Sequence, residues 1–308
     1  MTLAMVFPGQ GSQSQGMQAD LAEHFDVVTD TYAEASEVLG YDLWALVQDG
    51  PAERLGETTV TQPAMLAAGV AAWRAWKAAG GEDATQMAGH SLGEYSALVS
   101  AGAVAFADAM RVVKRRSELM QAAVPVGVGA MAAILGLDDE VVEAVCAEVG
   151  DAGVAEPVNY NSPGQVVIAG HAAAIDKAVE LAKERGARRA LVLPVSVPAH
   201  SSLMREAGET LAETLAETAF ESPAITVISA AAAKPYTDAD DIRTRLSTQV
   251  FSPVQWVGTV QALIAGGATR VVECGPGKVL AGLTRRIDKS IASGFIDNHD
   301  SLQKLLQD

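Results

Sequence analysis

The stretch TQMAGHSLGEYSALVSA, residues 85–101, decides the fold. Residues 85–88 are predicted to form a short strand and residues 92–101 a helix. Between them, GHSLG (89–93) matches the pattern G-x-S-x-G, in which a serine stands on a sharp turn between a strand and a helix. The glycines permit the tight turn, which exposes the hydroxyl above the end of the strand. Ser91 is therefore the candidate nucleophile, although so short a pattern also occurs in ordinary glycine-rich turns.

Predicted strands and helices alternate on both sides of this stretch. LAMVF (3–7) indicates a buried strand, and helical patterns occupy most of residues 17–79 and then 105–123. Such alternation is typical of a parallel sheet with helices on both faces. It resumes late in the chain, with helices predicted at 201–220, 242–250, 253–265 and 279–288, the last of these as the final helix, and strands at 225–229 and 270–274.

The middle of the chain has a different order of elements. Between residues 129 and 195 the pattern predicts strand, helix, strand, strand, helix and strand, which is the ferredoxin-like unit. Pro125 and Pro198 mark its two ends as hinges. We therefore expect an α/β fold, in which a parallel-sheet, hydrolase-like large domain (1–125 and 199–308) carries an inserted ferredoxin-like small domain (126–198). The predicted strands of this unit are 129–135, 154–159, 165–169 and 190–195, and its helices are 138–149 and 172–185.

The composition favours a globular protein and argues against nucleic acid as a partner. Of the 308 residues, 49% are apolar, enough for a large core, and 19% are charged, too few for a disordered chain. Aromatic residues make up only 5%, which is low for a platform that stacks bases. The formal charge of −16 repels phosphate backbones and anionic lipids. Neither nucleic acid nor a membrane is an expected partner.

Signals for export, membrane insertion or metal binding are missing from the sequence. The first residues lack a basic region and reach Pro8 too early for a signal peptide. The longest uncharged apolar stretch, 64–73, is far shorter than the ~18 residues of a membrane span. Cys146 and Cys274 match no metal or redox spacing, and no exposed apolar seam suggests an obligate oligomer. We expect a soluble, cytoplasmic monomer without a metal.

Two glycine-rich loops resemble nucleotide-binding loops, but their spacing is wrong. The loop at 9–11 follows a predicted strand, yet the distance to Gly16 breaks the pattern G-x-G-x-x-G. The loop at 275–278 ends in Gly-Lys, yet Val272 stands where a phosphate-binding loop has its first glycine. No nucleotide cofactor is expected.

A serine nucleophile needs a base, and elimination among five histidines leaves His200. This residue opens a helix just after the last strand of the middle unit, where the chain re-enters the large domain. Parallel sheets place their sites at such strand ends. His24 lies in a polar helix, His299 near the C-terminus and His171 in the inserted unit. His90 neighbours Ser91, but adjacent side chains of a strand diverge.

Two arginines in an apolar helix form a second candidate feature. Arg115 and Arg116 follow Val112 and Val113, and one of the two should face inward if that helix packs on the sheet. A buried guanidinium needs a carboxylate or a comparable acceptor. Spacing alone favours the alternative, in which both arginines lie on a solvated helix face.

Six motifs, in order along the chain, resemble the malonyl-CoA:acyl-carrier-protein transacylase family of the bacterial fatty-acid synthesis type. The similarity runs essentially from end to end. The motifs are FPGQGSQ (7–13), GHSLGEYSAL (89–98), NSPGQ (161–165), VPAH (197–200), FSPVQW (251–256) and ECGPGKVL (273–280).

The resemblance implies an acyltransferase that moves malonyl from malonyl-CoA to the phosphopantetheine thiol of acyl carrier protein, in fatty acid biosynthesis. It implies a ping-pong reaction through a serine acyl-enzyme, without a third acidic residue. The roles that it assigns are Ser91 as nucleophile, His200 as base, Arg116 as the ligand of the malonyl carboxylate, the backbone N–H groups of Gln10 and Leu92 as the oxyanion hole, and the carbonyl of Gln249 as the group that orients the histidine.

The sequence departs from the family in two places. Ala199 stands where relatives carry Ser or Phe before the histidine, which bears on tolerance of branched acyl groups. Four alanines (230–233) replace a polar stretch. Two other functions are alternatives: a serine hydrolase or thioesterase, and a non-catalytic scaffold that binds the carrier. The small domain and Arg116 argue against the hydrolase, and the joint presence of Ser91, His200 and Arg116 argues against the scaffold.

An acidic carrier must dock on local cations, because the chain itself is acidic. For each cation the alternative is an ordinary solvated helix end. The candidates are Lys183, Arg185, Arg188, Arg189, Lys278, Arg285 and Arg286.

Overall fold

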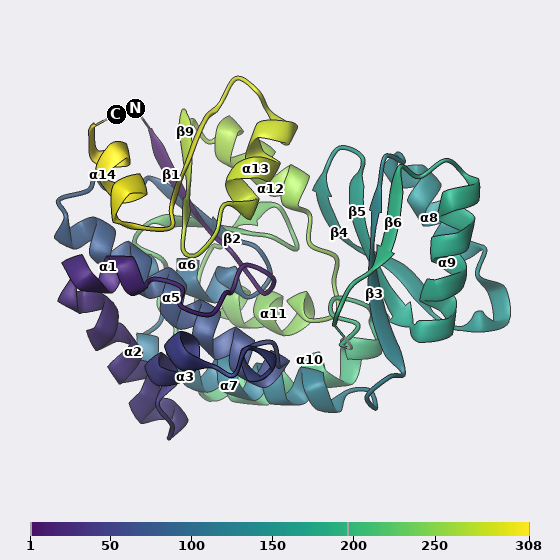
Figure 1. The fold of residues 1–308 in the computed structure, drawn as a ribbon, viewed down its shortest axis with the longest axis horizontal. Helices are drawn as coiled ribbons and strands as arrows, with labels where there is room; N and C mark the ends of the chain where they lie inside the picture. The colour runs from purple at the N-terminus through teal and green to yellow at the C-terminus, as the bar shows by residue number, and fades with distance from the viewer. Residues whose placement is uncertain (1, 196, 308) are drawn as a thin grey trace.

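The computed structural model describes residues 2–195 and 197–307, which form two sheets and their helices (Figure 1). Within these residues the larger sheet has the strand order β10-β9-β1-β2-β7-β8. Its neighbouring strands are parallel, except that β8 runs antiparallel to β7 at one edge. The predicted parallel sheet is confirmed. The strands are β1 (Leu3–Phe7), β2 (Gln86–Gly89), β7 (Thr226–Ser229), β8 (Lys234–Pro235), β9 (Arg270–Cys274) and β10 (Ala292–Ile296).

Strand β1 contributes to the cores on both faces of this sheet. All of its residues are buried. Because successive side chains of a strand point to opposite faces, Met5 and Phe7 pack in one core and Ala4 and Val6 in the other. Helices α5, α6 (Gly93–Ser100) and α14 (His299–Gln307) lie on the first face, and α2, α7 and α10 pack outside them in the same core. Helices α12 and α13 cover the second face. The bounds are α2 (Asp26–Leu39), α5 (Thr58–Ala78), α7 (Phe106–Ala122), α10 (Arg205–Glu217), α12 (Trp256–Ala265) and α13 (Val279–Ile287).

The remaining helices are shorter or lie at the margins of these layers. Among the described residues, none of the helices combines the length and the apolarity that crossing a bilayer requires. They are α1 (Ala19–His24), α3 (Leu43–Asp49), α4 (Ala52–Leu55), α8 (Asp139–Ala147), α9 (Ala172–Glu184) and α11 (Ala239–Gln249), with single 3-10 turns at Gly150–Ala152 and Ser202–Met204.

The carboxyl ends of three neighbouring strands meet at one edge of the large sheet. In the register of the sheet, Phe7 of β1 pairs with Gly89 of β2, and Val6 pairs with Glu273 of β9. The loops that follow β1, β2 and β9 therefore emerge side by side. Open α/β sheets bind their ligands at this edge.

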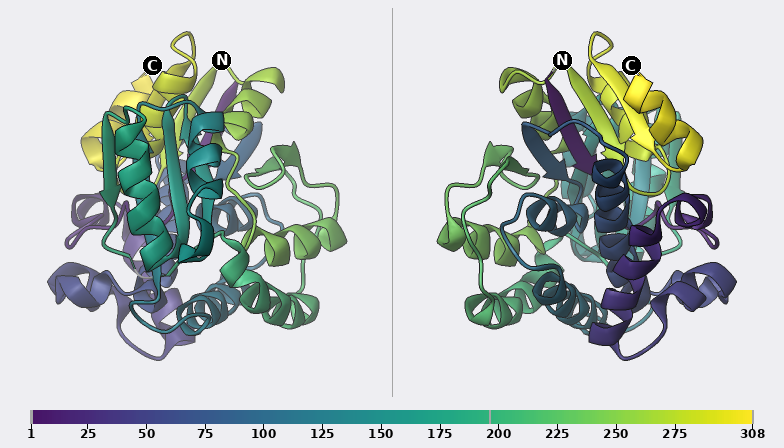
Figure 2. Two further views of the ribbon diagram at one scale, coloured as in Figure 1. Left: turned by 90° about the vertical axis from the view of Figure 1, so that its right-hand side faces the viewer. Right: turned by 90° about the vertical axis from the view of Figure 1, so that its left-hand side faces the viewer.

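The second sheet is antiparallel, with strand order β4-β5-β3-β6. Helices α8 and α9 cover its outer face, which is turned toward the viewer in the left panel of Figure 2. The order strand-helix-strand-strand-helix-strand is the one predicted from the sequence. The division into domains at 126 and 198 stays a prediction, and its range includes Ser196, which lies outside the described residues. The strands are β3 (Gly129–Leu135), β4 (Ala155–Ser162), β5 (Gln165–His171) and β6 (Arg189–Val192).

Strand β4 joins the small sheet to the rest of the molecule. Tyr160 N–H donates to the carbonyl of Val254 at 2.9 Å, and Val254 N–H donates to the carbonyl of Val158 at 2.8 Å. These bonds form a parallel bridge between Asn159 and Val254. The segment that precedes α12 therefore covers the outer edge of β4, while the opposite edge strand, β6, has exposed side chains at Leu191 and Val192.

The prediction for the end of the chain was wrong. Helix α13 is not the final helix, because β10 and α14 follow it. Strand β10 has the sequence ASGFI, in which Ala and Gly are weak strand formers. Its position is fixed by parallel pairing with β9, along Ala292 to Ile296. Such pairing with a strand already in the sheet leaves little local signal in the sequence.

Candidate active site

Ser91 stands on the turn between β2 and α6. Its φ is 51°, in the left-handed region that residues other than glycine rarely adopt. The chain enters the helix at once, and Glu94 N–H donates to the Ser91 carbonyl at 3.1 Å. Strained backbone of this kind persists only where the surrounding structure imposes it. The structure thus has the sharp strand-to-helix turn that the G-x-S-x-G pattern predicts.

His200 lies against Ser91. The Nε2 atom is 2.7 Å from Ser91 Oγ, and the Nδ1 atom is 2.8 Å from the main-chain carbonyl of Gln249. Because a carbonyl can only accept, Nδ1 carries the proton and Nε2 has a free lone pair directed at the serine hydroxyl. His200 itself has a φ of 67°. The arrangement is that of a nucleophile with its base, and the base is oriented by a carbonyl in place of a carboxylate.

The surroundings of His200 keep its ring neutral. Burial and, after it, the nearby Arg116 cation lower its pKa to about 3, while the bond to Gln249 opposes the shift. A lowered pKa means that the unprotonated ring persists to a lower pH than in a free histidine. Proton acceptance from Ser91 is therefore available throughout the neutral range.

The other histidines have different partners. His90 Nε2 is 2.8 Å from Asn161 Oδ1 on β4, and burial lowers the pKa of His90. His171 Nδ1 accepts from Val154 N–H at 3.0 Å in the small sheet. His24 and His299 stack on each other with centroids 3.8 Å apart. The structure thus brings His200, and none of these four, to Ser91.

Of the two adjacent arginines, Arg116 faces inward. Arg116 is 1% exposed, whereas Arg115 is exposed and lies 3.9 Å from Glu118 on the helix surface. Arg116 Nη1 donates to Gln62 Oε1 at 2.6 Å. Its Nη2 donates to Gln249 Oε1 at 3.1 Å and to Ser91 Oγ at 3.3 Å. The solvated face that spacing alone favoured applies to Arg115 only.

Arg116 is a buried cation that keeps spare hydrogen-bond donors. Among the residues that the structure describes, no carboxylate forms an ion pair with it, and its buried Nε has no partner. Burial lowers its pKa from the usual value, but an arginine stays charged in proteins. A desolvated guanidinium with free N–H groups is suited to an anionic ligand, above all a carboxylate.

These groups form the floor of a cavity of about 600 Å³ between the two sheets. Ser91, His200 and Arg116 lie on its polar side. The opposite wall comes from the small sheet and the chain after it, and is mostly apolar: Met131, Val167, Leu193 and Val195, with Ala199 beside the histidine. The cavity offers room for an acyl chain with one anionic end.

Gln10 and Leu92 also line this cavity. The loop after β1 packs closely on the serine turn, since a Cβ added at Gly9 would lie 2.6 Å from the His90 carbonyl oxygen and 3.7 Å from the Leu92 nitrogen. Neither the Gln10 nor the Leu92 main-chain N–H has an acceptor within the described part of the chain. Two unpaired backbone donors beside a nucleophile can bind a developing oxyanion.

Several residues of the site were not singled out from the sequence. Gln62 on α5, Glu94 on α6 and the side chain of Gln249 on α11 form hydrogen bonds around Arg116 and Ser91. Each is a buried polar residue, and Glu94 follows the serine motif in a helix that has no other charged residue. A charged residue at an inward position of such a helix is the signal that could have identified it.

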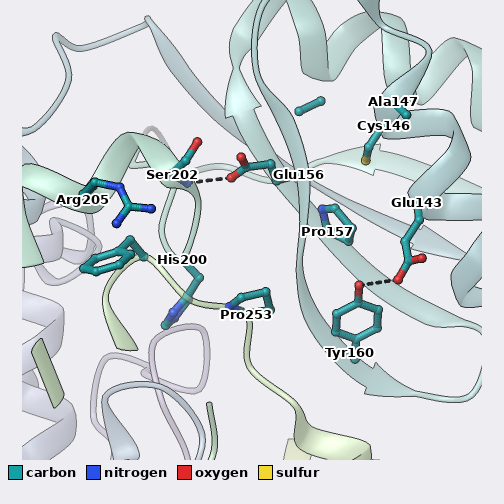
Figure 3. Close-up of a pocket in the computed structure, with 12 residues that line it drawn as sticks. Glu143, Cys146, Ala147, Glu156, Pro157, Tyr160, His200, Ser202, Arg205 and Pro253 are labelled. Carbon is teal, nitrogen blue, oxygen red and sulfur yellow. Dashed lines mark hydrogen bonds between the residues drawn. The ribbon is translucent and has the colours of Figure 1, made fainter. Parts of the chain in front are cut away.

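A second cavity, of about 520 Å³, lies on the other side of the segment that carries His200 (Figure 3). Its lining includes Glu143, Glu156 and Arg205. Glu156 on β4 accepts from Ser202 N–H at 2.6 Å, and this bond ties the chain after His200 to the small sheet. His200 lines both cavities, and in Figure 3 its ring points away from Glu143 and Glu156.

The remaining loops of interest do not have the features of phosphate sites. In the loop at 275–278, Gly277 N–H donates to Asp297 Oδ1 at 2.7 Å, so a carboxylate occupies that donor. Glu273 accepts from Ala281 N–H at the start of α13 at 2.9 Å. The alanine run at 230–233 forms the turn between β7 and β8.

Comparison with known proteins agrees with this arrangement. A family model described as "acyl transferase domain" matches residues 4–295. A malonyl CoA-acyl carrier protein transacylase of Escherichia coli (strain K12) is 51% identical over 304 residues, which cover 99% of this chain and 98% of that protein. The corresponding protein of Bacillus subtilis is 42% identical over 307 residues, 99% of this chain and 96% of that protein.

Two solved structures extend the comparison to the fold. An acyl carrier protein S-malonyltransferase from Vibrio cholerae has a TM-score of 0.96 and 53% identity, covering 99% of this chain and 100% of that one. A malonyl-transacylase solved in complex with a type II polyketide acyl-carrier protein has a TM-score of 0.98 and 50% identity, covering 100% of this chain and 99% of that one.

The lowered pKa of His200 predicts the pH dependence of Ser91 reactivity. Labelling of Ser91 by an uncharged alkyl fluorophosphonate should keep a nearly constant rate from about pH 8 down to about pH 5, because the ring is still unprotonated there. The measurement is the rate of adduct formation by intact-protein mass spectrometry. His200→Ala should be labelled at least ~100-fold more slowly at every pH. A half-loss of the wild-type rate near pH 6.5 would contradict the prediction.

Proposed function

The chain belongs to the acyl transferase family, and from this membership we propose that it transfers a malonyl group from malonyl-CoA to the phosphopantetheine thiol of an acyl carrier protein. The observation that carries the proposal is the buried Arg116 cation beside the Ser91–His200 pair, because it gives a serine acyltransferase a binding group for a carboxylate. The names of the relatives in E. coli, B. subtilis and V. cholerae support the same substrate.

In the first half-reaction, Ser91 attacks the thioester carbonyl of malonyl-CoA. His200 Nε2 takes the hydroxyl proton as the Oγ–carbon bond forms. The carbonyl oxygen becomes an oxyanion, which accepts hydrogen bonds from the N–H groups of Gln10 and Leu92. Collapse of this intermediate breaks the carbon–sulfur bond, and His200 returns its proton to the coenzyme A thiolate.

In the second half-reaction, the carrier thiol attacks the malonyl ester. His200 takes the thiol proton, the sulfur attacks the ester carbonyl, and the same two backbone donors bind the oxyanion. The carbon–oxygen bond to Ser91 breaks, and His200 protonates the serine oxygen as it leaves. The reaction is a double displacement that needs neither a metal nor a third acidic residue.

Arg116 selects the malonyl group through its free carboxylate. A guanidinium can bind a carboxylate by two parallel hydrogen bonds, and Arg116 has unpaired N–H donors for this purpose. Because the cation is desolvated, an acyl group without a negative charge leaves it unmatched. We infer that malonyl is preferred over acetyl for this reason.

The carrier belongs, in our proposal, to fatty acid biosynthesis. One neighbour in structure was solved in complex with a type II polyketide acyl-carrier protein, so both carrier classes belong in an assay. Of the candidate docking cations, Arg189 is the best placed. It lies on β6 next to Ala190, whose side chain packs in the core under α8 and α9. Because neighbouring side chains of a strand alternate, Arg189 points to the other face of the small sheet. Leu193, four residues further on, lines the cavity.

Intact-protein mass spectrometry after mixing with malonyl-CoA tests the function directly. A stable malonyl increment on Ser91, discharged by holo carrier protein, is the expected result. Ser91→Ala should fold normally and gain no increment. Rapid release of free malonate would indicate a hydrolase, and the absence of any reaction would indicate a scaffold. An adduct on another residue would contradict the assignment of Ser91.

Substitution of Arg116 should change the choice of acyl group. Arg116→Ala should lower the rate of Ser91 malonylation at least ~30-fold, because a buried charge pair is lost, while acetylation stays or rises. Arg116→Lys should recover little, since a point charge lacks the paired geometry. Arg115→Ala is the matched control and should change neither rate. Equal loss of both acyl groups would make Arg116 structural.

Charge reversal at the cleft rim should affect the second half-reaction alone. Arg189→Glu should raise the KM for carrier protein several-fold, because the cation acts on the carrier within a Debye length of ~8 Å. This increase in KM should be larger at lower salt. Malonylation by malonyl-CoA should be unchanged. Arg185→Glu is the control, since Arg185 already pairs with Glu148. Carrier transfer without salt dependence, or an equal effect of both reversals, would show that docking does not use Arg189.

A further inference from the structure

Glu94 is a buried carboxylate next to the site that the reaction, as described, does not use. It lies in the first turn of α6 and is fully buried. Its Oε2 accepts from Gln249 Nε2 at 2.6 Å, and its Oε1 accepts from the hydroxyl of Tyr236. Burial raises the pKa of Glu94, and the hydrogen bonds from Tyr236 and Gln249 act against that shift. Burial of a carboxylate costs free energy, so its presence here indicates a structural or functional role.

Gln249 connects Glu94 to the reacting groups. Its Nε2 donates to Glu94 and, at 2.9 Å, to the main-chain carbonyl of Ser91. Its Oε1 accepts from Arg116 Nη2, and its own main-chain carbonyl accepts from His200 Nδ1. One buried residue therefore holds the guanidinium with its side chain and the imidazole with its backbone.

The orientation of the Gln249 side-chain amide depends on its partners: a donor beside its oxygen and acceptors beside its nitrogen. Arg116 can only donate, so it fixes the oxygen of the amide. The nitrogen has two N–H groups, and the carbonyl of Ser91 and the carboxylate of Glu94 are their acceptors. Without Glu94, a buried N–H would lack a partner, and the amide would turn away from Arg116 to find one.

We propose that Glu94 is a positioning residue, which holds the Gln249 side chain by hydrogen bonding and through it sets the Arg116 guanidinium and the His200 ring against Ser91. The inference rests on the proposed function for the part that concerns Arg116. The part that concerns His200 applies to any serine chemistry at this site. Glu94 itself touches neither substrate nor reacting atom.

Two substitutions separate hydrogen bonding from mere filling of space. Glu94→Gln keeps an oxygen that can accept from Gln249, while its amide nitrogen can donate to the Tyr236 oxygen. Glu94→Leu fills similar space without an acceptor. Two rates are measured for each variant: malonylation of Ser91 by malonyl-CoA, and labelling of Ser91 by an uncharged alkyl fluorophosphonate, which needs His200 but not Arg116.

The leucine variant should lose at least ~10-fold in both rates, as expected when a buried hydrogen bond that positions a catalytic group is lost. The glutamine variant should stay within ~3-fold of wild type. In a double-mutant cycle with Gln249→Leu, the double variant should be no slower than Gln249→Leu alone, because Glu94 acts only through Gln249.

Glu273 provides the matched control. It is likewise fully buried, near the end of β9, and burial raises its pKa to about 7, but it binds the start of α13, and the hydrogen bonds of the Gln249 side chain go to other residues. Glu273→Leu should lower the melting temperature while a folded sample keeps both rates. If Glu94→Leu does not fold, Glu94→Asp replaces it, since the shorter side chain withdraws the acceptor and should give the same loss.

Normal probe labelling of Glu94→Leu, equal losses in the leucine and glutamine variants, or additive losses in the cycle would each overturn the proposal. Failure of the proposed function gives a different result. In that case the wild-type protein would not take malonyl from malonyl-CoA, while the probe would still report whether Glu94 positions the Ser91–His200 pair.

Discussion

Helix α6 meets the ends of β1 and β2 so closely that the contact leaves no space for side chains. A Cβ added at Gly89 would lie 1.9 Å from the carbonyl carbon of Gly93, and one added at Gly93 would lie 2.0 Å from the carbonyl oxygen of Phe7. Because the backbones touch here, the chain has to reverse from strand β2 into helix α6 at Ser91, and this residue adopts a left-handed φ as a result. The position of the hydroxyl, and the point from which α6 projects Glu94 inward, both follow from this contact.

The small sheet is joined to the large one at places that bear on the site. Asn161 of β4 binds His90, the residue before Ser91, and Glu156 of β4 binds the chain just after His200. The bridge from Asn159 to Val254 holds β4 to the segment that follows α11, the helix that ends with Gln249. The wall of the cleft and the groups on its floor are therefore parts of one hydrogen-bonded framework. A shift of the small sheet would displace the segments that carry both Ser91 and His200.

The sequence carried more information on the fold than on the polar interior of the site. The alternation of elements, the order of the middle unit and the serine turn are local patterns, and the structure has each of them. Strand β10 was missed because its pairing with β9 is a tertiary contact. Spacing could show that either Arg115 or Arg116 faces inward, but the choice depends on how α7 is rotated against α5. The side-chain contacts of Gln249 and Glu94 join residues far apart in sequence, so no local pattern contains them. The roles of the site residues stay predictions until the reactions are measured.

Strand β1 lies between β2 and β9 in the finished sheet, and the two ends of the chain lie close together (Figure 1). During synthesis β2 can pair with β1 early, but residues 90–269 must be made before β9 reaches the other edge. At ~5–20 residues per second this takes roughly ten to forty seconds. Meanwhile the small sheet, whose strands are close in sequence, can form. During this time β1, an entirely apolar strand, has one unpaired edge, and such edges are templates for association between chains. The yield of folded protein therefore depends on what shields the unpaired edge of β1 until β9 has been synthesised.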